Sequence, residues 1–435
     1  MSVFIIQFNE ANFDLIEKYA ENFDFPVLHK ILESPVAIKT ESEALYENLE
    51  PWIQWYSFYT GLKFSEHKVF HLGDCIKEGH VSIFDRLASK GVSVGLFSSM
   101  NHKYNPDFKI FIPDPWTTTE PDGSFSSRIV CRSMRTLINE NSSLRATPYS
   151  VFGLIWMMGL RGLFRPALIF RYMLAYVTSD RARLAGLFDR LLLEYSIRRS
   201  LKEDLSVSSI FLNGLAHVQH HYLKHALFRD GSDQIEMPCD GERIDPVGDA
   251  LRLYDQSFKL LFNLMDAGHE IWIITGLTQE VHQENEHYWR FRSHDRVFQQ
   301  LLQSRFECFP RMSRDFQLIF EYESEAIACT EILENCVIRN AEDEFPCFGN
   351  IDQVDNSVFA SFVYGEQMKD VQMIYGDDVR IDLGDELVYV ALKNAGHVQH
   401  GWAFSNMARN IEENTSPVCI WDLAESFVFQ QTRAN

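Results

Sequence analysis

Residues 205–225 read Leu-Ser-Val-Ser-Ser-Ile-Phe-Leu-Asn-Gly-Leu-Ala-His-Val-Gln-His-His-Tyr-Leu-Lys-His. The first half is rich in Val, Ile, Phe and Ser, which predicts a short buried strand of the kind found in parallel sheets. The second half holds four of the fifteen histidines of the chain. It follows the strand directly, where open α/β sheets bind their ligands. The stretch therefore indicates both the class of fold and the place of a site.

The histidine-rich half is a candidate metal site. If Asn213 ends the strand, then Asn213, His217, His220 and His221 fall on one short segment, and their side chains can converge on a cation. The alternative is a polar loop or helix start whose histidines only form hydrogen bonds or contact solvent.

Other segments have the composition of buried strands, and helical patterns alternate with them. Strands are expected at residues 2–8, 92–98 and 269–275, and helices at 13–21, 82–90 and 249–267. This alternation predicts an α/β fold with a mostly parallel central sheet flanked by helices.

Polar side chains follow two of these strands. Asn9, Glu10 and Asn12 come after the first strand and before a helix, a place suited to an anion or a metal. Asn12 has a structural alternative as the helix cap. Gln279 follows strand 269–275 and is expected at the same edge of the sheet.

A further helix is expected from Pro51 to Gly61, because proline favours the first helical position and glycine the end. Trp52 and its aromatic neighbours have helical spacing, which is more typical of core packing than of a binding surface. Glu50 and Gln54 are harder to explain as packing, so we treat them, with Trp52, as candidate site residues.

Composition limits the class of function. The net charge of −21 disfavours general binding to nucleic acid or to anionic membranes, although a local basic pocket is allowed. The N-terminus has neither a basic region nor a cleavage site, so we expect a cytoplasmic protein. Eight cysteines occur without a Cys-x-x-Cys pair, which argues against a zinc ribbon or a thioredoxin-like site.

Residues 126–203 differ in character and are expected to form a helical insertion or cap. Residues 151–177 are strongly apolar, but Arg161, Arg165 and Arg171 interrupt them. No uncharged run of about 18–20 residues is left to span a bilayer. An amphipathic helix lying on a membrane surface, giving peripheral membrane contact, is the alternative.

The domain organisation follows from these segments. We expect residues 1–125 and 204–290 to form two parts of the α/β core, 126–203 the insertion, 291–370 a smaller mixed α/β insertion, and 371–435 the closing part.

The order of the motifs resembles the alkaline phosphatase superfamily, especially its nucleotide pyrophosphatase/phosphodiesterase and sulfatase-like branches. It also resembles a divergent bacterial branch associated with surface-polysaccharide gene clusters. The matching pieces are Asn9-Glu10, the helix from Glu50-Pro51 to Thr60-Gly61 followed by His67, Asn213-x-x-x-His217, Leu277-Thr278-Gln279, and His400-Gly401. The resemblance implies an alkaline-phosphatase-like sheet.

Departures from the family pattern concern its two cation sites and its nucleophile. Pro51 stands where the resemblance places the nucleophile and has no hydroxyl. Asn9, Leu277 and Thr278 replace ligands of the first cation, so that site is absent. The second site is partly retained. Its expected ligands are Asn213, His217 and His400, with His397, His220 or His221 as substitutes.

A site with two or three imidazoles suits one Zn²⁺, or a similar metal such as manganese, better than Mg²⁺. We therefore expect a metal-dependent hydrolase or group-transfer enzyme with a remodelled single-metal site. Its substrate would be a phosphorylated, sulfated or nucleotide-linked sugar in surface-glycan synthesis. Water activated by the metal would attack, with Glu50, Glu10 and His220 as catalytic candidates and Asn9, Asn12, Gln54, Trp52 and Gln279 as substrate-binding candidates. The alternative is a non-catalytic descendant that binds a glycan precursor or a biosynthetic partner and needs no metal.

Overall fold

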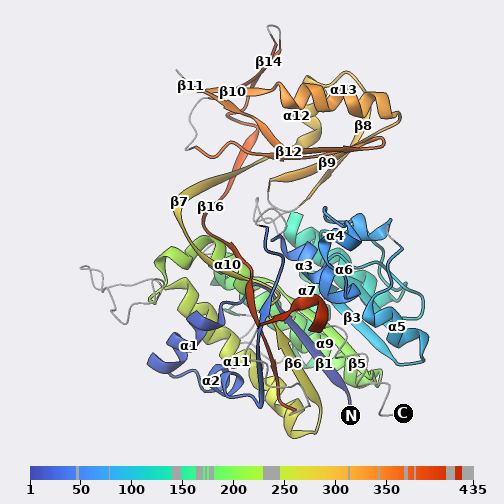
Figure 1. Cartoon of the computed structure of the whole chain (residues 1–435), viewed down its shortest axis with the longest axis vertical. Helices are drawn as coiled ribbons and strands as arrows, with labels where there is room; N and C mark the ends of the chain where they lie inside the picture. The colour runs from blue at the N-terminus through green and yellow to red at the C-terminus, as the bar shows by residue number, and fades with distance from the viewer. Residues whose placement is uncertain are drawn as a thin grey trace. The chain divides into compact units, whose positions relative to one another are not determined.

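The computed structural model divides the chain into two compact units (Figure 1). Unit 1 comprises Met1–His282 and Ala395–Asn435, and unit 2 comprises Gln283–Asn394. The structure describes residues 1–45, 49–77, 79–139, 148–162, 170–171, 174–175, 181–228, 245–311, 314–340, 343–366, 371–376, 379–407 and 417–423. Parts of the expected insertion 126–203 and the chain beyond residue 423 lie outside the described residues.

An eight-stranded sheet forms the centre of unit 1, in the order β18-β2-β17-β6-β1-β5-β3-β4. The strands are β1 (Val3–Phe8), β2 (Val36–Glu41), β3 (Val94–Ser99), β4 (Ile110–Pro113), β5 (Val207–Leu212), β6 (Glu270–Ile274), β17 (His400–Ser405) and β18 (Val418–Cys419). β17 runs antiparallel to β2 and β6, and the other neighbouring strands are parallel. The predicted mostly parallel sheet is confirmed.

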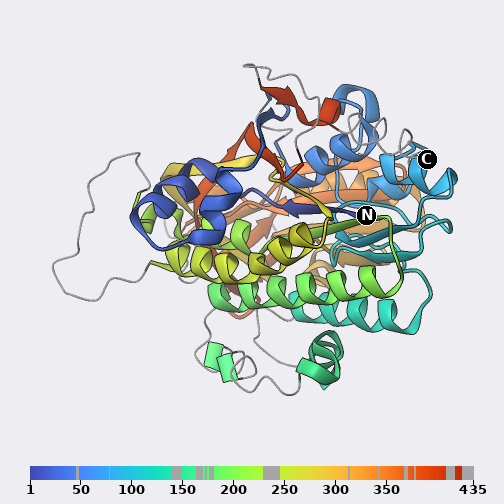
Figure 2. The same ribbon diagram turned by 90° about the horizontal axis from the view of Figure 1, so that it is seen from below.

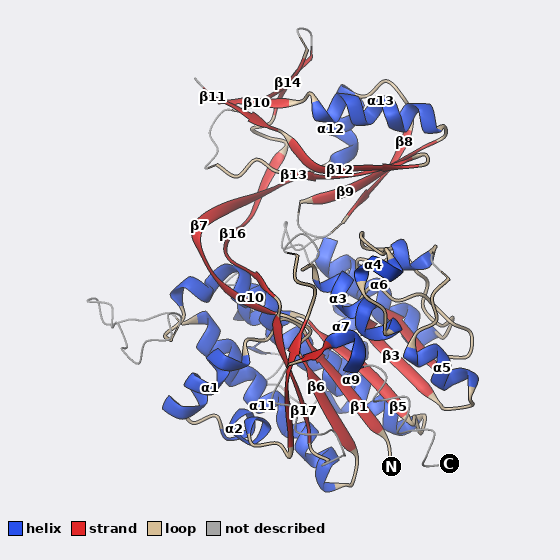
Figure 3. Cartoon of the chain, in the orientation of Figure 1, coloured by secondary structure: helices blue, strands red, loops and turns tan. Residues whose placement is uncertain are grey.

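Helices flank this sheet (Figure 3). They are α1 (Phe13–Asn22), α2 (Pro26–Leu32), α3 (Pro51–Thr60), α4 (Phe64–His67), α5 (Ile83–Ser89), α6 (Phe125–Asn139), α7 (Pro148–Gly162), α9 (Arg181–Lys202), α10 (Gly214–Tyr222) and α11 (Pro246–Asp266). Short 3₁₀ turns occur at Asp74–Ile76 and Leu223–His225. Within the described residues, no helix combines the length and apolarity needed to cross a membrane.

β1 shows how the sheet is covered. All six of its residues are buried, as expected for a central strand with helices on both faces. Phe4, Ile6 and Phe8 pack into the core that includes α1, α2 and α11. On the opposite face, Gln7 donates a hydrogen bond to Tyr59 of α3 at 2.9 Å.

The strand register places the site. Phe8 of β1 pairs with Leu212 of β5, and Gln7 pairs with Ile274 of β6. The carboxyl ends of these parallel strands therefore lie at one edge of the sheet. The segments after them, which begin at Asn9, Asn213 and Thr275, emerge side by side.

Unit 2 has two four-stranded sheets, in the orders β11-β10-β14-β15 and β12-β13-β9-β8. Its elements are α12 (His294–Leu301), β8 (Phe306–Pro310), β9 (Asp315–Phe320), α13 (Glu323–Glu334), β10 (Val337–Asn340), β11 (Asp343–Pro346), β12 (Phe348–Val354), β13 (Ser357–Phe362), β14 (Gln372–Tyr375) and β15 (Val379–Asp382). β7 (Thr278–Phe291) and β16 (Leu387–Val398) pair as a two-stranded sheet. The expected mixed insertion 291–370 falls within unit 2.

Candidate metal centre

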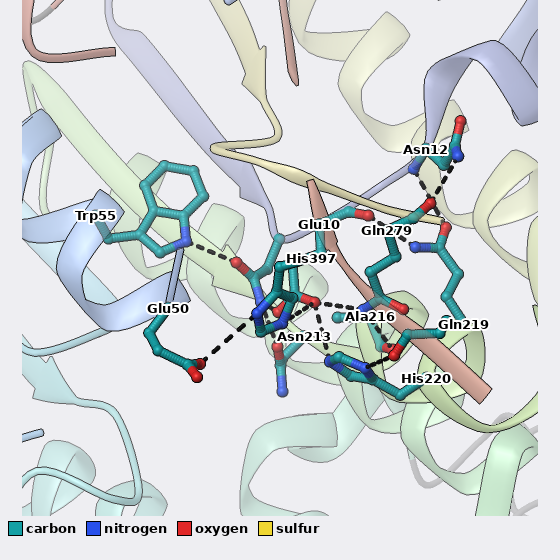
Figure 4. A network of polar contacts seen from close by, with 12 residues as sticks. Glu10, Asn12, Glu50, Trp55, Asn213, Ala216, Gln219, His220, Gln279 and His397 are labelled. Carbon is teal, nitrogen blue, oxygen red and sulfur yellow. Dashed lines mark hydrogen bonds and ion pairs between the residues drawn. The ribbon is translucent and has the colours of Figure 1, made fainter. Parts of the chain in front are cut away.

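Three side chains from separate parts of unit 1 converge at the carboxyl edge of the sheet (Figure 4). Glu10 follows β1, His220 lies on α10, and His397 lies near the end of β16. The Oε2 of Glu10 is 3.0 Å from the Nε2 of His220 and 3.1 Å from the Nε2 of His397. The ligand atoms of all three residues lie within 4.8 Å of one another, which is close enough to hold one metal ion.

The backbone turns sharply at Glu10. Its φ of 56° lies in the left-handed region, which is uncommon for a non-glycine residue and is kept where surrounding contacts hold it. Here the enforcing contacts are on both neighbouring strands: the Asn9 amide donates to the Leu212 carbonyl, and the Glu10 amide donates to the Thr275 carbonyl, each at 3.0 Å. Backbone strain in a buried charged residue is typical of functional sites.

The Glu10 carboxylate is buried, with 2 % of the residue exposed. Burial opposes its ionisation, but the charges of His397 and His220 outweigh this effect and hold its pKa well below the usual value. Asn9 Nδ2 donates to its Oε1 at 2.7 Å, and Gln279 Nε2 donates to its Oε2. Glu10 is therefore an ionised, fully contacted carboxylate, suited to be a ligand.

The other ring nitrogens of the two histidines face oxygen atoms. The Nδ1 of His220 is 3.4 Å from the carbonyl oxygen of Ala395, and the Nδ1 of His397 is 3.7 Å from Oε2 of Glu50. In a neutral ring, a proton held at Nδ1 by such an acceptor would leave the lone pair at Nε2 for a metal. Without a metal, a protonated ring directs its second N–H toward Glu10 and supplies the charge that lowers the pKa of Glu10.

His397 gives the clearest sign of a missing partner. Its Nε2 is buried, and among the described residues it has no aligned hydrogen-bond partner, although Glu10 Oε2 lies 3.1 Å away. A cation between the carboxylate and the imidazoles would satisfy this nitrogen. One carboxylate and two imidazoles fit zinc or a similar divalent metal.

A chain of amide contacts fixes the orientation of the site. The indole Nε1 of Trp55 donates to Asn9 Oδ1 at 2.7 Å, and Asn9 Nδ2 also donates to Asn213 Oδ1 at 2.8 Å. Because an indole can only donate, Asn9 must direct its NH₂ group toward Glu10 and Asn213. Sequence reasoning treated Trp55 as core. The available signal was that a buried indole N–H needs an acceptor.

Gln219, which was not a candidate from the sequence, supports the same turn. Its Nε2 donates to the Glu10 carbonyl at 2.7 Å, and its Oε1 accepts from the Asn12 amide at 3.2 Å. Asn12 Oδ1 caps α1 by accepting from Leu15 N, and Asn12 Nδ2 donates to the Gln279 carbonyl. Asn12 therefore helps to fix the position of α1, and Gln279 helps to fix the position of Glu10.

The remaining predicted histidines lie outside the Glu10–His220–His397 cluster. His217 and His221 are one helical turn apart on α10, with ring centroids 4.7 Å apart, and His221 lies 6.5 Å from His220. His400 is exposed on β17, where it pairs with Glu41 of β2. Among the described residues, none of these three belongs to the group of potential ligands that contains Glu10.

Three predicted residues come from the start of α3. Trp52 is buried and its Nε1 donates to the Phe70 carbonyl at 2.8 Å, while the Oε1 of buried Gln54 accepts from the Glu43 amide at 3.2 Å. These contacts hold neighbouring loops. The Glu50 side chain differs, because it is 38 % exposed and faces His397.

His67 and Ser57 form a buried pair that resembles a nucleophile and base. The Val69 amide donates to His67 Nδ1 at 3.0 Å, so the ring proton lies on Nε2, which donates to Ser57 Oγ at 3.0 Å. Burial lowers the pKa of His67 to about 4. In this tautomer His67 has no lone pair facing the serine, and the pair is structural.

Comparisons with protein-family models and with curated proteins give no match. The chain is similar to the solved structure of phosphonoacetate hydrolase from Sinorhizobium meliloti with phosphonoformate, at a TM-score of 0.44, 12 % identity, and coverage of 99 % of this chain and 95 % of that chain. It is also similar to wild-type alkaline phosphatase PafA (TM-score 0.43, 11 % identity, 99 % and 95 % covered). The same coverage holds for murine ectonucleotide pyrophosphatase/phosphodiesterase 5, at a TM-score of 0.38 and 10 % identity. With TM-scores this low, the roles of the site residues rest on their own geometry.

Proposed function

We propose that the chain is a divergent, alkaline-phosphatase-like hydrolase or group-transfer enzyme that uses one divalent metal, zinc or manganese, held by Glu10, His220 and His397. The observation that supports this most directly is the buried, ionised Glu10 carboxylate facing two Nε2 atoms, one of them without an aligned partner. A divalent cation bound here would contact the Glu10 carboxylate and both Nε2 atoms at once.

A bound cation would supply the charge that polarises an ester oxygen and makes water more acidic. Glu10 would neutralise part of that charge. The side chain of Glu50 is partly exposed, unlike that of Glu10, so Glu50 can accept a proton from an attacking water or acceptor hydroxyl. Pro51 cannot form a covalent intermediate, which favours direct attack.

Asn213 is placed to orient the substrate. Its Oδ1 is occupied by Asn9, so its NH₂ group points away from Asn9, as Figure 4 shows. This group can donate to an anionic ester oxygen. We propose a phosphorylated, sulfated or nucleotide-linked sugar of surface-glycan synthesis as substrate, on the basis of the motif order described above.

Metal content tests this proposal. Protein freed of metal by chelation and then equilibrated with Zn²⁺ or Mn²⁺ should bind one ion per chain, measured by elemental analysis after desalting. His397→Ala should lose the ion, whereas His400→Ala, a matched change outside the cluster, should keep it. Chelator-sensitive activity on phosphate and sulfate esters should be lost in His397→Ala and kept in His400→Ala, which would support a catalytic metal. A wild-type protein that binds no ion contradicts it.

A non-catalytic binding protein is the second candidate, because Pro51, Asn9, Leu277 and Thr278 stand where the resemblance places a nucleophile and metal ligands. Such a protein would bind sugar phosphates or nucleotide sugars without turnover. Calorimetric binding of an ester that stays intact over prolonged incubation with metal-loaded protein would favour this candidate.

A further inference from the structure

An apolar face on α6 and α7 is exposed in unit 1. On α7, Phe152, Ile155 and Trp156 are 45 %, 39 % and 37 % exposed. They are spaced i, i+3 and i+4, so they share one side of the helix. Phe125 of α6 is 61 % exposed and packs edge-on against Trp156, with ring centroids 5.4 Å apart. These four side chains form a continuous apolar surface, here called the α6–α7 face.

The opposite side of α7 is also apolar. Met157 is fully buried in the main core, and Leu154 and Met158 pack against Leu187 and Leu191 of α9. Gly153 lies so close to α6 that an added Cβ would be 1.7 Å from Ser133 Oγ. A helix that is apolar on both sides normally has both sides covered. Here one side is covered by α6 and α9, and the other is exposed.

Two short helical pieces, residues 170–171 and 174–175, also expose apolar side chains. Phe170 and Leu174 are 65 % and 42 % exposed, while Ala175 is buried in the same small cluster as Leu187 and Leu191. Figure 2 shows α7 and these two pieces, in green, outside the layer that α6 and α9 form.

The charge of this region is opposite to that of the rest of the chain. Residues 125–177 contain seven arginines and one acidic residue, Glu140, so their net charge is +6 and the remaining chain carries −27. Arg128 is exposed and follows Phe125 by three residues on α6, which places it on the same side of the helix. Arg171 is exposed beside Phe170.

We propose that the α6–α7 face, with Arg128, Phe170, Arg171 and Leu174, docks on the surface of an anionic lipid membrane. Exposed aromatic and aliphatic side chains next to arginines are the pattern of helices that lie in a membrane interface, and Trp favours that depth. Cations beside an apolar face add attraction to anionic lipids, which a chain of net charge −21 would otherwise avoid.

A second copy of the chain fits this surface less well. In a two-fold dimer the same face contacts itself, so Arg128 and Arg171 would meet the arginines of the partner. The membrane proposal is argued independently of the metal centre, because the two sites share no residue.

Vesicle flotation tests the proposal. Full-length protein is mixed with phosphatidylcholine vesicles that contain or lack phosphatidylglycerol, at about 0.1 M and about 0.5 M salt. We expect flotation with phosphatidylglycerol vesicles, which weakens at high salt. The double variants Phe152→Ser/Ile155→Ser and Arg128→Glu/Arg171→Glu should each lower the bound fraction by about tenfold. Metal content and circular dichroism identify any variant that fails to fold.

Matched controls use exposed residues elsewhere. Tyr322→Ser/Ile327→Ser changes two exposed apolar residues of unit 2, and Lys90→Glu/Lys109→Glu changes two exposed cations of unit 1. Both should float as wild type does. Absence of flotation, or equal loss in test and control variants, overturns the proposal. So does a wild-type dimer that Phe152→Ser/Ile155→Ser dissociates without changing flotation, because that face would then be a protein interface.

Discussion

Glu10 combines two unfavourable features at one residue. Its left-handed backbone costs about 1–3 kcal/mol, and its carboxylate is ionised in a buried position. The surrounding contacts compensate: two backbone amide bonds hold the turn, and two imidazoles and two amide groups face the carboxylate. The negative charge of Glu10 is thus the feature that the rest of the site is arranged to keep.

Replacing this charge while keeping the shape gives a direct test. Glu10→Gln should weaken zinc binding by more than the roughly 10–100-fold loss that is typical of outer-shell changes, because a direct ligand and its charge are lost. Competition with a chromophoric chelator measures the affinity. Glu17→Gln, an exposed change on α1, is the control. Equal affinities in wild type and Glu10→Gln would remove Glu10 from the metal centre.

Glu50 is expected to act through His397 as well as on the substrate. Its carboxylate, 3.7 Å from His397 Nδ1, favours the tautomer with a free Nε2. Glu50→Gln should therefore weaken zinc binding by about tenfold. It should also lower kcat by roughly 100-fold or more at saturating metal, since a general base is lost. If kcat recovers fully once metal is saturating, Glu50 only positions His397.

The sequence could predict at which strand ends the candidate cluster lies, but not which histidines meet there. Asn9, Glu10, Asn213 and Gln279 all follow parallel strands, whose carboxyl ends share an edge whatever the details. The choice of His220 over its neighbours depends on the rotational phase of α10. That phase is set by tertiary contacts to its first residues, which the local pattern does not contain.

At the scale of elements, α10 is anchored by two other helices. Asp189 of α9 accepts hydrogen bonds from the Gly214 amide and from the Tyr254 hydroxyl of α11, each at 2.6 Å. A carboxylate at a helix N-terminus also complements the helix dipole. Gly214 permits this close approach, because an added Cβ would be 2.6 Å from the Tyr254 hydroxyl and 2.8 Å from the Ala185 carbonyl.

Gly214→Ala should therefore displace the start of α10 and move His220. We expect a loss of about 1–3 kcal/mol in the free energy of unfolding, from overpacking, together with weaker zinc binding. Urea unfolding and metal titration measure the two effects. Gly79→Ala is the control, because its Cβ would meet nothing within 4 Å. If Gly214→Ala has the stability and the zinc affinity of the wild type, α10 is not positioned by this contact.

Asp189 gives the anchor a pH dependence. Burial raises its pKa from 3.8 to about 6, against the opposing effect of its hydrogen bonds. Between these values the folded protein holds a proton that the unfolded chain has released, so its contribution to stability falls as pH rises. From about pH 5 to about pH 7 this loss is roughly 1 kcal/mol.

Asp189→Asn should remove this loss of unfolding free energy between the two pH values. Asp249→Asn, which replaces an exposed residue of α11, should leave it in place. The measurement is the difference in unfolding free energy between the two pH values. The same difference in wild type and Asp189→Asn would contradict the assignment of a raised pKa.

Element boundaries were predictable where they are encoded locally. The helix expected from Pro51 to Gly61 is α3, with Gly61 in the left-handed cap conformation at φ 72°. The position of β17 was not predictable from the sequence, because this strand pairs antiparallel with β2 and β6, far away in sequence. Such long-range pairing leaves no mark on the strand's own composition.

At the scale of the whole molecule, each of the two compact units has a main hydrophobic core of its own among the described residues. The main core of unit 1 contains residues of β1, α1, α10 and α11, and that of unit 2 contains Phe291, Phe298, Phe316 and Phe348. All three candidate metal ligands belong to unit 1. Metal binding should therefore stabilise the core of unit 1 directly. It should stabilise the core of unit 2 only if the two units unfold cooperatively.

Calorimetry with and without zinc measures that cooperativity. Ligand at about 100 times its Kd adds roughly 2.7 kcal/mol to the state that binds it, which should raise the unfolding transition of unit 1 by several degrees. Phe298→Ala, which removes a buried ring packed on Phe316, should cost about 3–5 kcal/mol and lower the transition of unit 2. If zinc moves one transition and Phe298→Ala the other, the units unfold independently. If zinc and Phe298→Ala both shift one single transition, the two cores unfold as one cooperative unit. The cores would then be separate in the structure but not in their unfolding equilibrium.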